Sequence, residues 1–137
     1  MKVVLDTNVL VSGTFWKGDS SRILEFIDSG KLELVLSGEL IEEYNEVIER
    51  DEIMDKVENK NLILNKAVVG IIKDSIIIEP KQKFDVVKDD ADDNKVLECA
   101  FEGQVNYIIS QDNHLLNLKE FQGIKVLTPK EFLEILK

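Results

Sequence analysis

The sequence is poor in the residues that build covalent and zinc-bound scaffolds. It has one cysteine, one histidine and two prolines in 137 residues. A single cysteine excludes an internal disulfide and is typical of a reducing compartment, so we expect a cytoplasmic protein. There is also no cluster of histidine and cysteine residues that would hold zinc.

Long apolar runs are absent as well. No run approaches the roughly 18 residues that cross a membrane, so we expect no membrane segment. The apolar start does not read as a signal peptide, because Asp6 interrupts it and no small-residue cleavage site follows. By its length the chain is expected to form a single domain over residues 1–137.

Positive charge is scarce: 17 basic residues stand against 27 acidic ones, for a net charge of −10. This balance argues against a protein that coats nucleic acid, because such a protein needs a basic face. It does not exclude an enzyme that meets a phosphodiester through bound metal ions, since a cation reverses the local sign of charge.

Short apolar runs alternate with helical patterns along the chain. The runs are mostly apolar on both faces, which is typical of parallel strands covered by helices on both sides. We expect strands at 2–5, 32–36, 75–79, 107–110 and 124–127, and helices at 19–30, 37–50, 51–72, 93–102, 112–119 and 128–137. This order predicts an α/β domain with a mainly parallel sheet, in which functional sites form beyond the carboxyl ends of the strands.

Two acidic residues follow predicted strands. Asp6 ends the run at 2–5, where an ionised carboxylate beside the core is costly unless something pairs with it. Asp112 follows the strand "YIIS" by two residues, and taken alone it is best interpreted as the N-cap of the next helix. Because the carboxyl ends of parallel strands share one edge, we expect the two carboxylates to lie at that edge.

Two further acidic residues are placed by helical periodicity. Glu43 borders the apolar stripe of its helix, and taken alone it would be a snorkelling edge residue. Asp93 stands three, four and seven residues before buried-face positions, at the positive end of its helix. Asp93 belongs to the acidic run at 89–93. In this run Asp92 is a cap or a second ligand, while the aspartates at 89 and 90 are expected to face solvent.

The four acids Asp6, Glu43, Asp93 and Asp112 come from separate elements and can converge in one pocket. Four anions in one pocket repel one another unless cations hold them. Oxygen-only ligands favour Mg²⁺ or Mn²⁺. We expect His114 to lie on a helix surface or to contact substrate rather than to bind the metal.

Several segments in this order resemble the PIN domain family, in particular its VapC-like toxin branch. They are "VVLDTNVLVSG", "LSGELIEEYNEVI", "DDADDNKVLECA", "YIISQDNHLLNL" and "VLTPKEFLEIL", which together span residues 2–136. The resemblance implies a three-layer α/β/α fold and a metal-dependent ribonuclease acting on single-stranded or structured RNA. It also implies a homodimer and a possible cognate antitoxin as partners.

The family's acids fall on Asp6, Glu43, Asp93 and Asp112, which the resemblance makes catalytic and metal-binding residues. The positions that it makes supporting are Thr7, Asn8, Ser110 and Asp92. In the implied chemistry Asp6 is the central ligand, and Glu43 binds a second ion or orients the attacking water. The family often has another acid two residues after the fourth one, and here that position is His114.

Three other readings stay open at this point. A receiver-type phosphoacceptor domain needs paired acids after its first strand, where this chain has Thr7 and Asn8. A haloacid-dehalogenase phosphatase needs an aspartate at the position of Asn8. A catalytically inactive PIN-like interaction module would keep the fold but not the site, and the presence of all four acids speaks against it.

Overall fold

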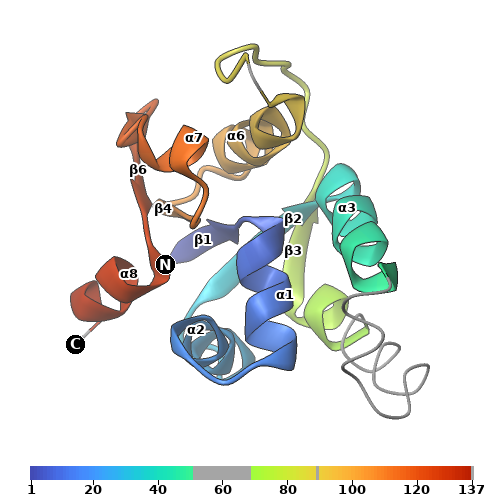
Figure 1. Cartoon of the computed structure of the whole chain (residues 1–137), viewed down its shortest axis with the longest axis vertical. Coiled ribbons are helices and arrows are strands. Elements are labelled where there is room, and N and C mark those ends of the chain that lie inside the picture. Colours follow the sequence, from blue (N-terminus) through green and yellow to red (C-terminus); the bar gives the residue numbers. More distant parts are fainter. Residues whose placement is uncertain (51–68, 89, 137) are drawn as a thin grey trace.

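The strands form one sheet at the centre of the computed structural model, which describes residues 1–50, 69–88 and 90–136 (Figure 1). Within these residues the sheet has six strands in the order β3-β2-β1-β4-β6-β5. All neighbouring strands are parallel except β5, which is antiparallel to β6. The strands are β1 (Lys2–Leu5), β2 (Glu33–Ser37), β3 (Ser75–Ile78), β4 (Tyr107–Ile109), β5 (Glu120–Phe121) and β6 (Ile124–Leu127).

Helices cover both sides of the sheet. In Figure 1, α6 and α7 lie above it and α1, α2 and α8 lie below it, with α3 beside the β3 end. They are α1 (Thr7–Phe15), α2 (Asp19–Asp28), α3 (Gly38–Glu49), α6 (Ala91–Gly103), α7 (Asn113–Leu116) and α8 (Pro129–Ile135), and residues 69–74 are also helical. Among the described residues, no helix has the length and apolarity that a membrane crossing needs.

The first strand lies in the middle of the sheet, and the core is built around it. β1 pairs with β2 on one side and with β4 on the other. Val3, Val4 and Leu5 are fully buried, as are Ile108 and Ile109 of β4. The predicted α/β/α architecture with a mainly parallel sheet is therefore confirmed, and the carboxyl ends of β1 and β4 lie side by side.

Most predicted elements are present; Ser37 caps α3, and Thr128 and Glu131 form a capping box at the start of α8. Helix α1 was not predicted. Its residues Val9, Leu10 and Val11 are all buried, so it has no polar face and shows no amphipathic period. The two-residue strand β5 is too short to leave a pattern, and the helix predicted at 112–119 is shorter than expected, since α7 ends at Leu116.

Other boundaries also differ from the predictions. Helix α2, expected at 19–30, ends at Asp28 and is capped by Gly18. The Ser21 hydroxyl accepts a hydrogen bond from the Gly18 N–H at 2.9 Å. Of the helix predicted at 51–72, residues 51–68 lie outside the described residues.

We expect Gly13→Ala to lower the free energy of unfolding by about 1–3 kcal/mol through overpacking. Gly13 lies where α1 meets α2. A Cβ there would stand 2.7 Å from Leu24 Cδ1 and 2.9 Å from the Ser20 carbonyl oxygen, so the backbone must shift. Gly38→Ala is the control, because a Cβ at Gly38 meets nothing within 4 Å. Urea unfolding measures both variants, and equal midpoints would contradict the prediction.

Candidate metal centre

Asp6 stands at the end of β1 and is held on both carboxylate oxygens. Its N–H donates to the Ile109 carbonyl at 3.0 Å, which continues the β1–β4 pairing by one residue. Its Oδ1 accepts from the Thr7 N–H at 2.8 Å and its Oδ2 accepts from the Ser110 hydroxyl at 2.9 Å. Asp6 is 7% exposed, so it is a buried carboxylate with a fixed orientation that also caps α1.

Ser110 connects the ends of β1 and β4. Its side chain is fully buried. The hydroxyl donates to Asp6 and accepts from the Asp112 N–H at 2.9 Å, so a single oxygen fixes two acidic residues. Asp112 Oδ1 in turn accepts from the His114 N–H at 2.7 Å, which confirms its predicted role as the N-cap of α7.

The start of α6 brings two aspartates to the same edge. Asp93 is 4% exposed and lies on the buried face of the helix, as its periodicity predicted. The prediction that Asp90 faces solvent is wrong: it is half-buried and caps α6 by accepting from the Asp92 N–H at 3.0 Å. Asp92 is therefore not the cap; it is exposed and pairs with Lys95 at 3.0 Å.

The segment before α6 is tied to the helix, which sets the position of Asp90. Asn94 Oδ1 accepts from the N–H groups of Val86 and Val87 at 3.1 and 2.9 Å. Its Nδ2 donates to the Val87 carbonyl at 2.9 Å. Because Asn94 is buried, this clamp cannot exchange freely with water, and it fixes where the chain enters the helix.

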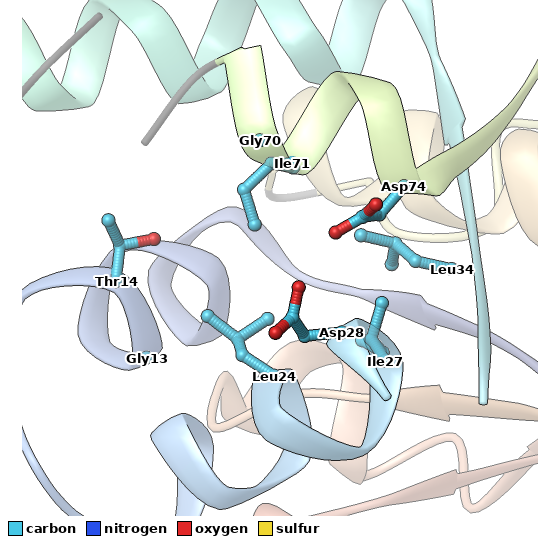
Figure 2. Close-up of a pocket in the computed structure, with 9 residues that line it drawn as sticks. All are labelled: Gly13, Thr14, Leu24, Ile27, Asp28, Leu34, Gly70, Ile71 and Asp74. Atoms are coloured by element: carbon cyan, nitrogen blue, oxygen red, sulfur yellow. The ribbon is translucent and has the colours of Figure 1, made fainter. Parts of the chain in front are cut away.

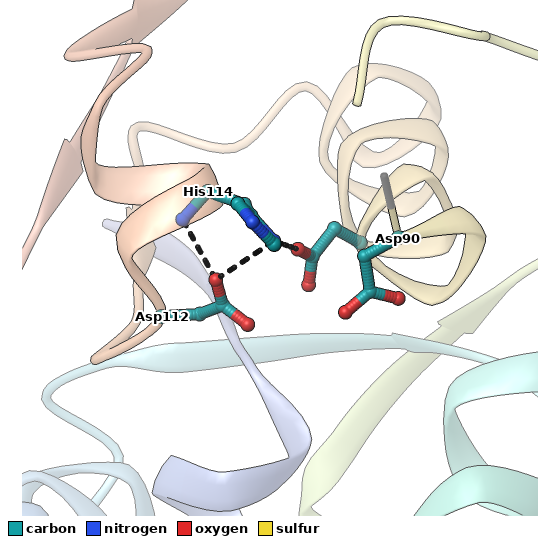
Figure 3. Close-up of side chains that lie close together, drawn as sticks. Asp90, Asp112 and His114 are labelled. Carbon is teal, nitrogen blue, oxygen red and sulfur yellow. Dashed lines mark hydrogen bonds and ion pairs between the residues drawn. The ribbon is translucent and has the colours of Figure 1, made fainter. Parts of the chain in front are cut away.

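Four side chains form the tightest group of potential ligands in the described part of the chain. One carboxylate oxygen each from Asp90, Asp93 and Asp112 and a ring nitrogen of His114 lie within 4.8 Å of one another. Figure 3 shows Asp112 and His114 beside α7 and Asp90 at the start of α6, with a further carboxyl group between the ring and Asp90. Asp6 is not in this group, although its charge acts on Asp93.

Glu43 projects from α3 toward the Asp6 side of the centre. Burial is the main cause that raises its pKa, and the charges of Asp92 and Asp6 raise it further. The Thr7 hydroxyl and the charge of Lys95 lower the pKa of Glu43, so both groups stand near its carboxyl. Glu43 thus neighbours Asp6, as the sequence predicted, but it stands outside the tightest group.

Asn8, the remaining supporting position, is exposed. In the described part of the chain it makes no hydrogen bond to any of the acids. The support that the sequence assigned to Asn8 comes instead from the Thr7 backbone and the Ser110 hydroxyl.

The surroundings of Asp93 favour the protonated form of its carboxyl group. Burial is the largest cause, and the neighbouring charges of Asp112, Asp90 and Asp6 add to it. His114 acts in the opposite direction, and the net result raises the pKa of Asp93 to about 7. A carboxyl in this condition takes up a proton readily unless a cation stands beside it.

Asp6 responds to its surroundings in a similar way. Burial raises its pKa, and the hydrogen bonds from Ser110 and from the Thr7 backbone oppose the rise. The charges of Asp112 and Asp90 raise the pKa of Asp6 further. The charges of the acids that follow β1 and β4 and of those at the start of α6 therefore act on one another.

Three buried side-chain oxygens in the described residues have no hydrogen-bond partner: Thr7 Oγ1, Glu43 Oε2 and Asp93 Oδ2. Asp93 belongs to the tightest group, while Thr7 and Glu43 stand on its Asp6 side. Buried polar atoms are nearly always satisfied, so a concentration of unsatisfied acceptors at one place calls for a donor or a cation. Together with the carboxylates, these oxygens fit a divalent cation that prefers oxygen ligands.

A separate pocket of about 300 Å³ lies away from the acids (Figure 2). Leu34 near the start of β2 and Asp74 just before β3 both line it, which puts it toward the amino ends of the strands. Asp28 and Asp74 point into it in Figure 2. The acids of the candidate centre lie at the opposite edge of the sheet, so this pocket is not part of that centre.

Residues 2–114 match the family model of the PIN domain. Two solved structures resemble the chain. PAE2754 from Pyrobaculum aerophilum has a TM-score of 0.65 and 11% identity, covering 99% of this chain and 90% of its own. VapBC2 from Rickettsia felis, bound to a DNA fragment from their promoter, has a TM-score of 0.62 and 11% identity, covering 92% and 97%. These two likenesses show the fold alone, and no curated protein matches the chain.

In metal-free protein we expect the free energy of unfolding to fall as the pH rises from about 4 to 7. The pKa of Asp93 is about 7 in the folded chain against an ordinary value of 3.8, so over this range the folded chain retains a proton that the unfolded chain has released. Asp93→Asn should flatten this dependence and raise the melting temperature at neutral pH.

Thermal melts in a chelator from pH 4 to 8 measure the effect. Asp85→Asn is the control, because Asp85 is an exposed carboxylate in the segment before α6. The two variants should diverge most at pH 7 and above. A steeper pH dependence in Asp93→Asn than in the wild type would contradict the assignment of the shift to this residue.

Proposed function

The chain belongs to the PIN domain family, and on that premise we propose that it is a metal-dependent endoribonuclease, the toxin component of a toxin–antitoxin pair. The observation that carries this proposal is the gathering of buried, unpartnered oxygens among the acids at the carboxyl edge of the sheet. Oxygens left unsatisfied in the metal-free protein are available to a cation and through it to a phosphodiester.

We assign the cation to Asp6, Asp93 and Asp112, with Glu43 at a second position. Mg²⁺ or Mn²⁺ held there would lower the pKa of a bound water and stabilise charge on the leaving 3′ oxygen. Asp6 is suited to the central place, because Ser110 and Thr7 fix its orientation. Asp93 offers Oδ2, which has no competing hydrogen bond.

Glu43 is the group we assign to the proton of the attacking water. Its Oε2 is buried and unpartnered, and burial raises its pKa from the ordinary value of a glutamate. A carboxylate of raised pKa is a better proton acceptor near neutral pH than an exposed one. The Thr7 hydroxyl, which faces Glu43, would keep the carboxylate turned toward the centre.

Single-stranded or looped RNA is the proposed substrate. The four acids are largely withdrawn from solvent: Asp6 and Asp93 are buried, and Glu43 and Asp112 are half-buried. An unstacked strand can bring its phosphate to such a site more easily than a stiff duplex can. The chain's net charge of −10 means that cations, rather than a basic face, must draw the phosphate in.

A cognate antitoxin and a homodimer are the proposed protein partners, in the cytoplasm. The antitoxin is suggested by the family resemblance and by the two-component name of the VapBC2 structure. The homodimer rests on the family resemblance alone. An antitoxin that covered the acids would block both cation and RNA, so the enzyme must be freed from it before it is assayed.

Mn²⁺ and Mg²⁺ should each raise the melting temperature of the wild-type protein. A cation that binds only the folded chain stabilises it by about 2.7 kcal/mol at a hundred times its Kd. Asp93→Asn should lose most of this response, because it removes a charge and an unpartnered oxygen from the site. Glu42→Gln, on an exposed position of α3, should keep the full response. A rise of equal size in all three proteins would show binding elsewhere.

Purified protein should cleave a single-stranded RNA panel only with a divalent ion. EDTA should stop the cleavage and added Mn²⁺ or Mg²⁺ should restore it. Glu43→Gln should lower the single-turnover rate by about a hundredfold or more, the usual effect of losing a general base. Asp93→Asn should lower it at least as much, because it also weakens cation binding.

Glu42→Gln is the matched control for Glu43→Gln. Both residues lie on the same turn of α3, but Glu42 is exposed, so its rate should stay near that of the wild type. Circular dichroism should show that all variants are folded. The wild type must be free of any co-purified protein for this test. If it then binds Mn²⁺ but cuts no RNA, the protein is an inactive interaction module and the proposed nuclease function is wrong.

A further inference from the structure

The only histidine of the chain, His114, lies at the acidic centre. Its ring is 47% exposed, and it stands on the first turn of α7. The Nδ1 atom is 3.6 Å from Asp93 Oδ2 and 3.7 Å from Asp112 Oδ1. Figure 3 shows the ring beside Asp112, with Asp90 on the opposite side. The position combines access from solvent with contact to two of the acids.

These two distances are too long for hydrogen bonds. They suit two ligands of one ion, because atoms at about 2.0–2.2 Å from a common cation lie at most about 4.4 Å apart. The Nδ1 atom and the two carboxylate oxygens therefore stand close enough together to be ligands of one cation.

A second observation points to a ligand in the same space. Asp93 Oδ2 is buried, has no hydrogen-bond partner, and lies 3.6 Å from His114 Nδ1. A carboxylate oxygen and a neutral ring nitrogen are both electron-pair donors. A cation between them would satisfy both, which the hydrogen bonds described in this region do not do.

We propose that His114 is a metal ligand, and that with Asp93, Asp112 and Asp90 it makes a mixed nitrogen–oxygen site that prefers Mn²⁺ to Mg²⁺. The proposal rests on the metal dependence proposed above and adds the choice of ion. Mg²⁺ favours oxygen ligands, whereas imidazole suits first-row transition metals. One nitrogen in place of one oxygen therefore shifts the preference toward the transition metal.

Three variants separate the role of the ring from that of its neighbours. His114→Ala removes the ligand, His114→Asp replaces it by an oxygen donor, and Gln111→Ala changes an exposed neighbour as a control. All three variants keep the backbone N–H at position 114, which donates a hydrogen bond to Asp112. The measurement is the Kd of Mn²⁺, from the electron paramagnetic resonance signal of the free ion, with Mg²⁺ as competitor.

His114→Ala should weaken Mn²⁺ binding by at least about tenfold, the lower range for losing even an outer partner of a metal. His114→Asp should bind Mg²⁺ more tightly than the wild type does, so the ratio of the Mg²⁺ and Mn²⁺ Kd values should fall by about tenfold. Gln111→Ala should leave both Kd values unchanged. Pulsed resonance of bound Mn²⁺ should show ring-nitrogen coupling in the wild type and none in His114→Asp.

The outcomes distinguish this inference from the function on which it rests. A wild type that binds neither ion overturns both. Mn²⁺ binding that is unchanged in His114→Ala, or a bound ion without nitrogen coupling, overturns the inference and leaves the metal-dependent nuclease standing. If His114→Ala weakens RNA binding but not Mn²⁺ binding, the ring contacts substrate and the inference is wrong.

Discussion

Repulsion between carboxylates is the constraint around which this end of the molecule is organised. Asp6, Asp93 and Asp112 are brought together although each makes ionisation of a neighbour harder. Hydrogen bonds from neutral groups hold them in place: the Ser110 hydroxyl and the Thr7 N–H for Asp6, and the His114 N–H for Asp112. None of these donors carries a full charge, so they orient the acids without neutralising them.

The topology of the sheet makes the convergence unavoidable. β1 and β4 are adjacent and parallel, so the residues that follow them emerge at the same edge. Helix α6 contributes the remaining acids from its N-terminus, where aligned peptide dipoles lower the cost of negative charge. The Asn94 clamp fixes how the chain enters that helix. Strand order, helix dipole and clamp together define where the acids lie before any ligand arrives.

Some features of the fold and of the acidic site can be predicted from the sequence, and others cannot. Asp6, Asp93 and Asp112 could be placed because each stands at the end of a clear strand or on one face of an amphipathic helix. Helix α1 could not, because burial on several sides removes the polar–apolar period that marks a helix. Asp90 was misplaced because a run of four aspartates does not show which one caps the helix. That choice depends on contacts with Val86 and Val87, which no local pattern encodes.

The unsatisfied oxygens show how stability and function are divided in this fold. Elsewhere the described core is mostly apolar, with the fully buried Val3, Val4 and Leu5 at its centre. At the acidic edge, Asp93 is buried without a partner although a neutral side chain of similar shape would fit the space at lower cost. Proteins keep such a local conflict where binding depends on it. Ionised Asp93 therefore lowers the stability of the metal-free protein at neutral pH, and a cation beside it would offset that cost.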